Sequence, residues 1–275
     1  MIEKSNVYAP GAYRHLLEIL KQEGYRFAAF REIFSRDDAQ KVVYLRHDID
    51  YSPVWALSFA RINAELGVSG TFFFQLRSPI YNLLAYQTLS VLNEIDGLGQ
   101  SLALHLTVDR VVPPDDRALA AQITADFQAT KQFVPGLQSV FSWHNPSLAP
   151  ELVQRGLDLV VPGMTNAYSR YFQETVKYYS DSNLRHSVDD LQKIILKEEP
   201  QLQLLLHPFQ WMAQGRNMQE VLANTWVQVI REREREFLTN HIYRGLFPSG
   251  MPDQWLGHLS TCLASYRAPL KSSAR

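Results

Sequence analysis

The sequence predicts an α/β fold, an irregular (β/α)7-type barrel with parallel strands. Seven short apolar runs alternate along the chain with stretches that have helical spacing. The runs are continuous rather than alternating, which is typical of strands buried on both faces in a parallel sheet covered by helices. The seven runs are Val42–Leu45, Thr71–Phe74, Leu102–Leu106, Val140–His144, Leu157–Val161, Val176–Tyr179 and Leu202–Leu206.

The helical stretches are expected at residues 11–24, 53–67, 115–133 and 216–238. Ser52 suits the N-cap of the second helix, and Pro53 suits its first helical position. The last helix follows the seventh run. We therefore expect one α/β barrel domain over residues 1–275, with a C-terminal helical extension from about residue 213.

Composition excludes several classes of protein. Of the 275 residues, 46% are hydrophobic and 20% are charged, which rules out dominant disorder. Cys262 is the only cysteine, so a disulfide scaffold is excluded. The 27 basic and 28 acidic residues give a net charge of -1, which argues against a broad nucleic-acid or anionic-membrane surface. No apolar run reaches the roughly 20 residues that span a bilayer. The first residues lack a signal-peptide pattern, so we expect a cytoplasmic protein.

Ionisable side chains gather at the carboxyl ends of the predicted strands. Because the active site of a parallel barrel lies at that face, groups far apart in sequence are expected to converge there. These groups are Asp48 and Asp50 after the first run, His105 in the third, His144 at the end of the fourth, Asp181 after the sixth and His207 after the seventh.

Asp48 and Asp50 are two residues apart, so on a strand their side chains point the same way. Two adjacent carboxylates ionise together only beside a cation or a donor. They are either a general base with a metal ligand, or a solvated turn that caps the next helix. His105 is either a core histidine or a metal ligand, and Asp109 follows it at a spacing common for ligand pairs.

Two interpretations also stay open for the later candidates. His144, which Asn145 and a proline follow, and His207 are either satisfied strand-end histidines or an acid or base working near neutral pH. Asp181 is either a turn residue or a carboxylate that orients a catalytic partner.

His47 and two tryptophans are weaker candidates. His47 either lines the pocket or bonds a backbone group. Trp143 and Trp211 either stack on sugar rings at the mouth of a pocket or fill the core.

The stretches from Leu45 to Ser52 and from Gly67 to Phe74 resemble the opening of the polysaccharide deacetylase family, the NodB-homology enzymes of carbohydrate esterase family 4. In that family a Thr-Phe-Asp-Asp-Gly motif is followed by a helix and a Gly-x-x-x-Thr-Phe-Phe strand. The version here, Arg-His-Asp-Ile-Asp, is similar to a divergent Arg-His-Asp-x-Asp branch. The resemblance covers roughly residues 42 to 212.

The resemblance implies a role for each motif position. Asp48 matches the catalytic base, and Asp50 replaces the metal-binding aspartate, shifted by one residue. His105 and Asp109 stand where the family has a His-x-x-x-His metal motif, and His144 is expected to supply a missing nitrogen ligand.

The run that ends in His207 resembles the Leu-x-Leu-His motif, whose histidine is the general acid. Asp181 resembles the aspartate of the fourth motif and is expected to act with the catalytic groups. The residues expected to contact substrate are His47, Trp143, Asn145 and Trp211.

The implied reaction is metal-dependent removal of an N-acyl group, typically acetyl, from a sugar or an intermediate of glycan biosynthesis. The expected cofactor is a divalent metal ion, zinc in the first place, with cobalt or nickel as alternatives. The expected partner is a carbohydrate or sugar derivative, with no nucleic acid and no membrane span. An inactive carbohydrate-binding relative and a hydrolase of a non-sugar amide stay open as alternatives.

Overall fold

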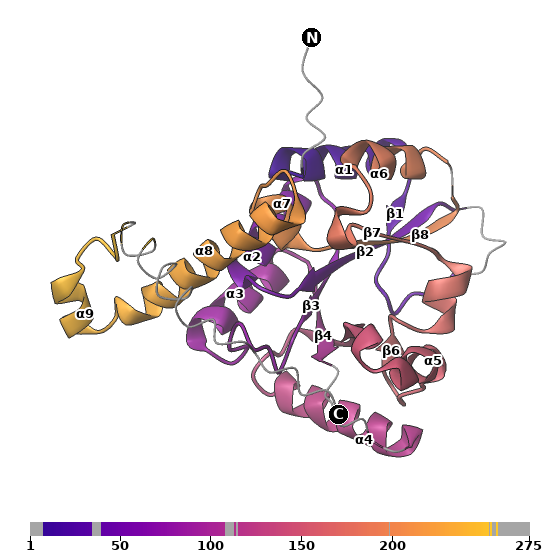
Figure 1. The fold of residues 1–275 in the computed structure, drawn as a ribbon. Helices are drawn as coiled ribbons and strands as arrows, with labels where there is room; N and C mark the ends of the chain where they lie inside the picture. The colour runs from indigo at the N-terminus through magenta and orange to yellow at the C-terminus, as the bar shows by residue number, and fades with distance from the viewer. Residues whose placement is uncertain are drawn as a thin grey trace, which may run out of the picture. The chain divides into compact units, whose positions relative to one another are not determined.

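The computed structural model describes residues 8–34, 40–107, 113, 115–197, 199–252, 254 and 257. The chain divides into two compact units, residues 1–225 and 226–275, whose boundary falls within helix α8 (Met218–Phe237). The first unit carries the sheet (Figure 1). The expected single domain with an extension from about residue 213 stays a prediction. Of the helices that the structure describes, none is long and apolar enough to cross a membrane.

The sheet is curled into a half-barrel, and each strand pairing between described residues is parallel, which confirms the predicted fold class. The strand order is β6-β5-β4-β3-β2-β8-β7, and β1 pairs with the start of β2. The strands are β1 (Arg26–Phe27), β2 (Val42–Ile49), β3 (Thr71–Phe74), β4 (Ser101–Thr107), β5 (Leu137–His144), β6 (Thr165–Asn166), β7 (Lys177–Ser180) and β8 (Gln201–Leu206).

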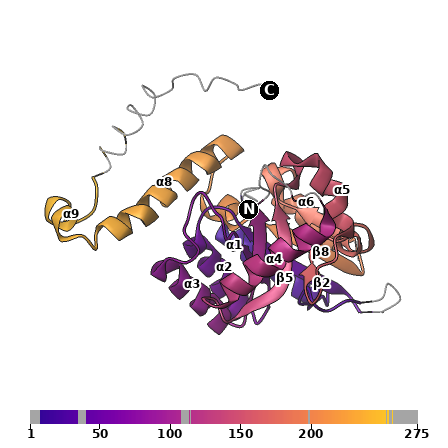
Figure 2. The same cartoon turned by 90° about the horizontal axis from the view of Figure 1, so that it is seen from below.

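Helices cover the outside of the curled sheet (Figure 1 and Figure 2). Those of the first unit are α1 (Pro10–Gln22), α2 (Pro53–Glu65), α3 (Tyr86–Gly97), α4 (Asp116–Lys131), α5 (Pro150–Asp158), α6 (Val188–Ile195) and α7 (Pro208–Met212), with short turns at Pro146–Leu148, Tyr171–Thr175 and Ser182–Leu184. The expected cap of α2 is present, because the Ser52 side chain accepts a hydrogen bond from the backbone of Trp55 at 3.1 Å. The second unit contains the end of α8 and α9 (His241–Leu246), which Asn240 caps.

Alternate residues of strands β2, β3, β4 and β5 belong to two different apolar clusters. In β2, Leu45 belongs to the large cluster that includes the buried faces of the helices, whereas Tyr44 belongs to a smaller cluster inside the half-barrel. Successive side chains of a strand point to opposite faces. Asp48 therefore lies on the inner face with Tyr44, and His47 lies on the helix face.

The prediction that the fifth apolar run forms a strand is wrong. The run Leu157–Val161 begins inside α5 and continues as a connection in which Val160 is exposed. Leu159 and Val161 are buried, so the apolar run reflects burial of a helix end and a loop rather than of a strand. The edge strand is β6, which follows a turn at Gly163 with φ of 74°.

His47 belongs to a buried polar network between β2 and the helices. Its Nε2 lies 3.1 Å from the hydroxyl of Tyr13, which donates to the side chain of Asn63. Asn63 in turn donates to Gln100 at 3.0 Å, and Gln100 accepts the backbone N–H of Gly70 at 2.8 Å. Burial lowers the pKa of His47 to about 3, so the ring stays neutral. His47 is fully buried in this network, which corrects the expectation that it contacts substrate.

The network predicts that Gly70→Ala destabilises the fold. A Cβ at this position would lie 3.1 Å from Asn63 Nδ2 and 3.2 Å from His47 Nε2, and both neighbours are held by hydrogen bonds. We expect the free energy of unfolding to fall by about 1–3 kcal/mol, measured by urea denaturation. Gly11→Ala is the control, because its Cβ would meet no heavy atom within 4 Å other than those of its chain neighbours and of the backbone of its own helix. Equal stabilities of the two variants would contradict the prediction.

Candidate active site

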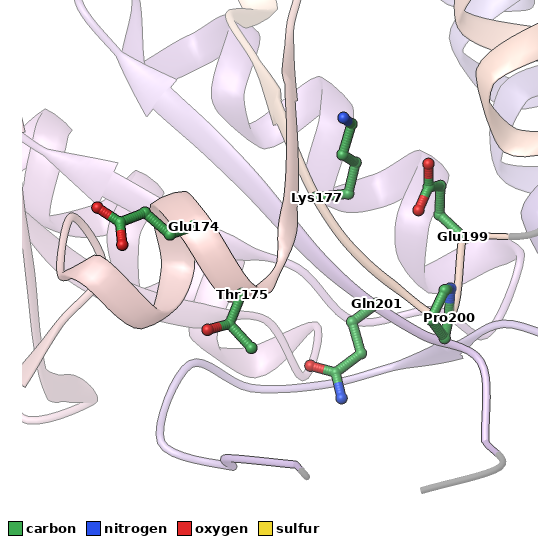
Figure 3. A pocket seen from close by; sticks show the side chains of 6 residues that line it. All are labelled: Glu174, Thr175, Lys177, Glu199, Pro200 and Gln201. Atoms are coloured by element: carbon green, nitrogen blue, oxygen red, sulfur yellow. The ribbon is translucent and has the colours of Figure 1, made fainter. Parts of the chain in front are cut away.

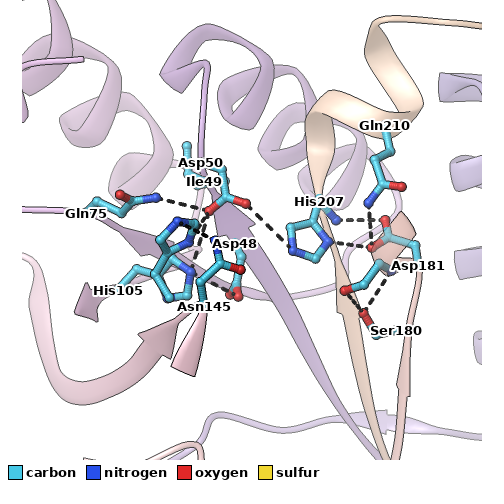
Figure 4. A network of polar contacts seen from close by, with 12 residues as sticks. Asp48, Ile49, Asp50, Gln75, His105, Asn145, Ser180, Asp181, His207 and Gln210 are labelled. Carbon is cyan, nitrogen blue, oxygen red and sulfur yellow. Dashed lines mark hydrogen bonds and ion pairs between the residues drawn. The ribbon is translucent and has the colours of Figure 1, made fainter. Parts of the chain in front are cut away.

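The carboxyl ends of the parallel strands bring the predicted ionisable groups to one edge of the sheet (Figure 4). Asp48 lies near the end of β2, His105 near the end of β4 and His144 at the end of β5. His207 directly follows β8, and Asp50 follows β2. Their side chains form a connected set of polar contacts.

Asp48 is held by an arginine of its own strand. Arg46 Nε and Nη2 donate to the two carboxylate oxygens of Asp48, each at 2.7 Å, and both residues are buried. The Asp48 Oδ2 atom also lies 3.3 Å from His105 Nε2. Burial raises the pKa of Asp48, but the charge of Arg46 and its hydrogen bonds outweigh it, so the pKa of Asp48 lies below the usual value. Asp48 is therefore an ionised carboxylate with a fixed orientation.

Asp50, His105 and His144 form a cluster of metal-type donors. One ligand atom from each lies within 4.8 Å of the others. Asp50 Oδ1 is 3.1 Å from His144 Nδ1 and 3.6 Å from His105 Nε2. One carboxylate oxygen and two imidazole nitrogens are a common ligand set for zinc and related divalent ions, with room for further ligands. The residues present therefore fit a divalent cation.

The protonation states of this cluster agree with that fit. Burial raises the pKa of Asp50, but hydrogen bonds from His105 and His144 bring it well below the usual value. Burial lowers the pKa of His105, and the two aspartates do not fully compensate, so the ring favours its neutral, ligand-competent form. Burial also lowers the pKa of His144, but its hydrogen bond to Asp50 more than compensates and the pKa is raised. A cation at the cluster would compete with that proton on His144.

His207 forms a dyad with Asp181. His207 Nδ1 lies 2.6 Å from Asp181 Oδ1, and the backbone N–H of His207 donates to Asp181 Oδ2 at 2.8 Å. The fully buried carboxylate of Asp181 also accepts hydrogen bonds from Trp211 Nε1 at 2.8 Å and from Gln210 Nε2 at 3.3 Å. Burial lowers the pKa of His207, but Asp181 and then Asp50 outweigh it and raise the pKa to about 9. The ring is therefore protonated at neutral pH.

The dyad faces the donor cluster through the other ring nitrogen. His207 Nε2 lies 3.9 Å from Asp50 Oδ2 (Figure 4). Asp181 thus occupies Nδ1, while Nε2 points towards the space beside the cluster. A substrate atom in that space would meet an imidazolium N–H on one side.

The structure corrects the prediction that Trp143 and Trp211 contact substrate, because both side chains are buried. Trp143 is next to His144 in β5, so it points to the opposite face and packs in the helix-side cluster with Phe141. Trp211 is fully buried and donates to Asp181, so it supports the dyad instead of forming a sugar platform.

Asn145 and Asp109 complete the predicted set. Asn145 is exposed beside the cluster, with its side-chain nitrogen 3.3 Å from His144 Nε2 and a left-handed backbone with φ of 47°. Asp109 lies outside the described residues.

Sequence reasoning missed three residues of the site: Arg46, Gln75 and Gln210. Arg46 was detectable, because a residue two positions before Asp48 on a strand must share its face. Gln75 and Gln210 carry no signal in the sequence, because a glutamine after an apolar run is an ordinary loop residue until its partners are known.

A second hollow lies at the other end of the sheet. Its lining includes Lys177 and Gln201, the first residues of β7 and β8 (Figure 3). Its volume is about 430 Å³, and its remaining lining residues are Glu174, Thr175, Glu199 and Pro200. Parallel strands begin at the edge opposite to the one where they end, so this hollow is separated from the histidines by the length of the strands. We assign no chemistry to it.

Solved structures similar to this chain include a family 4 carbohydrate esterase from Bacillus anthracis. It is 16% identical, with 80% of this chain and 86% of that chain covered and a TM-score of 0.38. The chitin deacetylase from the fungal pathogen Colletotrichum lindemuthianum is 14% identical, with 67% and 81% covered and a TM-score of 0.41. A mutant of a family 4 pseudoenzyme with restored enzymatic activity is 14% identical, with 70% of this chain covered and a TM-score of 0.41. This chain spans 64% of that protein.

Two of these proteins, the esterase and the pseudoenzyme, are described as family 4 members. No protein-family model matches the sequence, and no curated protein matches it. Identities of 14–16% and TM-scores of 0.38–0.41 carry no information on activity, which depends on the side chains of the site.

The dyad predicts a specific pH dependence of stability, measured on metal-free protein in a chelator. Folded His207 keeps its proton up to about pH 9, whereas an unfolded histidine releases it near 6.5. The protonated dyad therefore stabilises the fold fully below pH 6.5, and this stabilisation is lost as the pH rises through about 9. In Asp181→Asn the decline in the free energy of unfolding across this window should be smaller than in the wild type.

Asp190→Asn is the matched control for this experiment. Asp190 is a surface carboxylate of the α6 capping box, and hydrogen bonds from Ser187 lower its pKa, so it titrates below the window. It should keep the wild-type slope even if its stability falls. An Asp181→Asn variant with the wild-type slope would show that Asp181 does not set the pKa of His207.

Proposed function

We propose that this protein is a metal-dependent hydrolase that removes an N-acetyl group from a sugar or a glycan-biosynthesis intermediate. The observation that carries the proposal is the donor cluster of Asp50, His105 and His144, with Asp48 within 3.3 Å of His105 and the Asp181–His207 dyad within 3.9 Å of Asp50. The motif resemblance supplies the substrate class, a sugar derivative. Zinc as the metal and a cytoplasmic location stay predictions.

Asp50, His105 and His144 would hold the cation. A bound divalent ion supplies Lewis-acid polarisation of an acyl oxygen and lowers the pKa of a coordinated water towards neutrality. The chain contributes the orientation of the three donors. His105 is buried and favours its neutral form, and Asp50 is ionised, so two of the three donors have the charge state of a ligand before a cation arrives.

Asp48 would accept the proton of the attacking water. Its carboxylate is ionised and cannot rotate, because Arg46 holds both oxygens. The Oδ2 atom faces His105 Nε2, which places the accepting oxygen beside the donor cluster. Arg46 lowers the basicity of Asp48, so the carboxylate suits a water that is already acidified rather than bulk water.

His207 would donate a proton from Nε2 to the departing amine. The ring is protonated at neutral pH and its Nδ1 is bound to Asp181, so the proton available to a substrate is the one on Nε2. Trp211 and Gln210 keep the Asp181 carboxylate oriented. Asp48 and His207 thus supply a proton acceptor and a proton donor beside the donor cluster, and hydrolysis of an amide uses one of each.

The first test is whether the protein binds a metal and hydrolyses an acetylated sugar. After removal of metal with a chelator, release of acetate from an N-acetylated chito-oligosaccharide should fall to background, and Zn²⁺, Co²⁺ or Ni²⁺ should restore it. His105→Ala should lose most of the metal affinity, because it removes one donor of the cluster. Protein that binds the oligosaccharide but does not hydrolyse it, even after each of these ions is supplied, would favour the carbohydrate-binding alternative.

The second test addresses the base. Asp48→Asn should lower kcat by about 10²–10⁴-fold, because the amide cannot accept the proton of the water. Metal content and thermal stability are measured in parallel. Asp126→Asn is the matched control, because Asp126 forms a comparable bidentate pair with Arg77, at 2.6 Å for each contact, on helix α4 outside the site. An Asp48→Asn variant with the activity of the control would remove Asp48 as the base.

A further inference from the structure

We propose that Gln75 is a positioning residue that fixes the carboxylate of Asp50 for a divalent cation. This inference rests on the proposed function, because it concerns the same site. Gln75 directly follows β3, is 2% exposed, and donates from Nε2 to Asp50 Oδ1 at 3.1 Å (Figure 4). The accepting oxygen is the one that lies nearest to His144 Nδ1 and His105 Nε2.

Asp50 needs an external anchor because it lies past the end of its strand. β2 ends at Ile49, so the ladder of the sheet does not fix the residue that follows. The aspartate is tied instead to the neighbouring strand by the Gln75 amide. A tyrosine ties the backbones together as well: the Tyr81 hydroxyl accepts the N–H of Gln75 and donates to the carbonyl of Ile49, both at 2.8 Å.

The orientation of the Gln75 amide is itself determined. Its carbonyl oxygen accepts a hydrogen bond from Thr107 Oγ1 at 3.3 Å, which leaves the amide nitrogen to face Asp50. Thr107 is the last residue of β4, the strand that carries His105. One glutamine therefore connects the ends of β2, β3 and β4 at the level of the donor cluster.

Gln75 differs from the other partners of Asp50 in one respect. His105 and His144 contact Asp50 Oδ1 through the ring nitrogens that would ligate a cation, and a ligating nitrogen carries no proton to donate. His207 lies at 3.9 Å from the other oxygen, beyond hydrogen-bond distance. Among the described partners of Asp50, Gln75 is the hydrogen-bond donor that keeps its contact whether or not a cation is bound.

The experiment compares Gln75→Met with Gln203→Met. Methionine keeps the length and volume of glutamine and removes the amide donor. Gln203 is also fully buried, inside the same sheet, and its amide donates to the backbone of Phe172 at 3.0 Å rather than to a site residue. Zn²⁺ affinity is measured by competition with a chromophoric chelator, the Co²⁺ absorption spectrum reports the ligand geometry, and thermal unfolding is recorded without metal.

Both variants should lose stability in the metal-free state, because each removes a buried hydrogen bond. Only Gln75→Met should lose Zn²⁺ affinity, by about 10–100-fold, and change the Co²⁺ spectrum. Wild-type affinity and spectrum in Gln75→Met would overturn the role of Gln75 and leave the proposed function intact. An equal loss of affinity in both variants would also overturn it, because the effect would then be general to the fold. A wild-type protein that binds neither ion would overturn both proposals.

Discussion

The two-residue period of the parallel strands is the constraint on which the whole site depends. It sends one set of side chains into the helix layer and the alternate set into the half-barrel. Strand β2 therefore contributes Leu45 to the core and, three residues later, Asp48 to the site. Because the strands are parallel, the inner-face groups of β2, β4 and β5 emerge at the same edge. The helices pack against the other face of the sheet, so these inner-face positions do not have to be apolar and can carry ionisable groups.

Much of this arrangement was predictable because it follows from strand ends. The positions of Asp48, Asp50, His105, His144 and His207 all come from one rule, that polar residues at the ends of buried parallel strands converge. The same period would have excluded His47 and Trp143, since each is adjacent to a residue assigned to the inner face. Applying the convergence rule without the alternation rule produced those two errors.

Other features depend on contacts that no local pattern records. The run Leu157–Val161 resembled a strand because a buried helix end and loop have the same composition as a strand. Trp211 was predicted to stack on a sugar ring because the sequence does not show the partner of its indole N–H. That partner is Asp181, which is distant in the sequence and adjacent in the fold. Gln75 and Tyr81 meet Asp50 and Ile49 only through the pairing of β2 with β3.

The charges of the site explain why it would attract a cation. Asp48, Asp50 and Asp181 bring three carboxylates, against the positive charges of Arg46 and protonated His207. Three minus two leaves one negative charge, and it lies at Asp50, since Arg46 pairs with Asp48 and His207 with Asp181. Asp50 raises the pKa of His144 beside it, so a proton on His144 can balance the negative charge of Asp50. A divalent ion would displace that proton, and its binding would become weaker as the pH falls.

The residues that donate hydrogen bonds to the three carboxylates differ in charge, and this difference fits the role proposed for each carboxylate. Asp48 has to stay ionised until it accepts a proton, and a guanidinium favours that state. Asp181 has to keep a proton on His207, and neutral donors from Trp211 and Gln210 orient it without cancelling its charge. Asp50 would share its oxygen with a cation, and a lysine or arginine at position 75 would orient it equally well but repel that cation. A neutral amide donates a hydrogen bond and leaves the full negative charge for the ion.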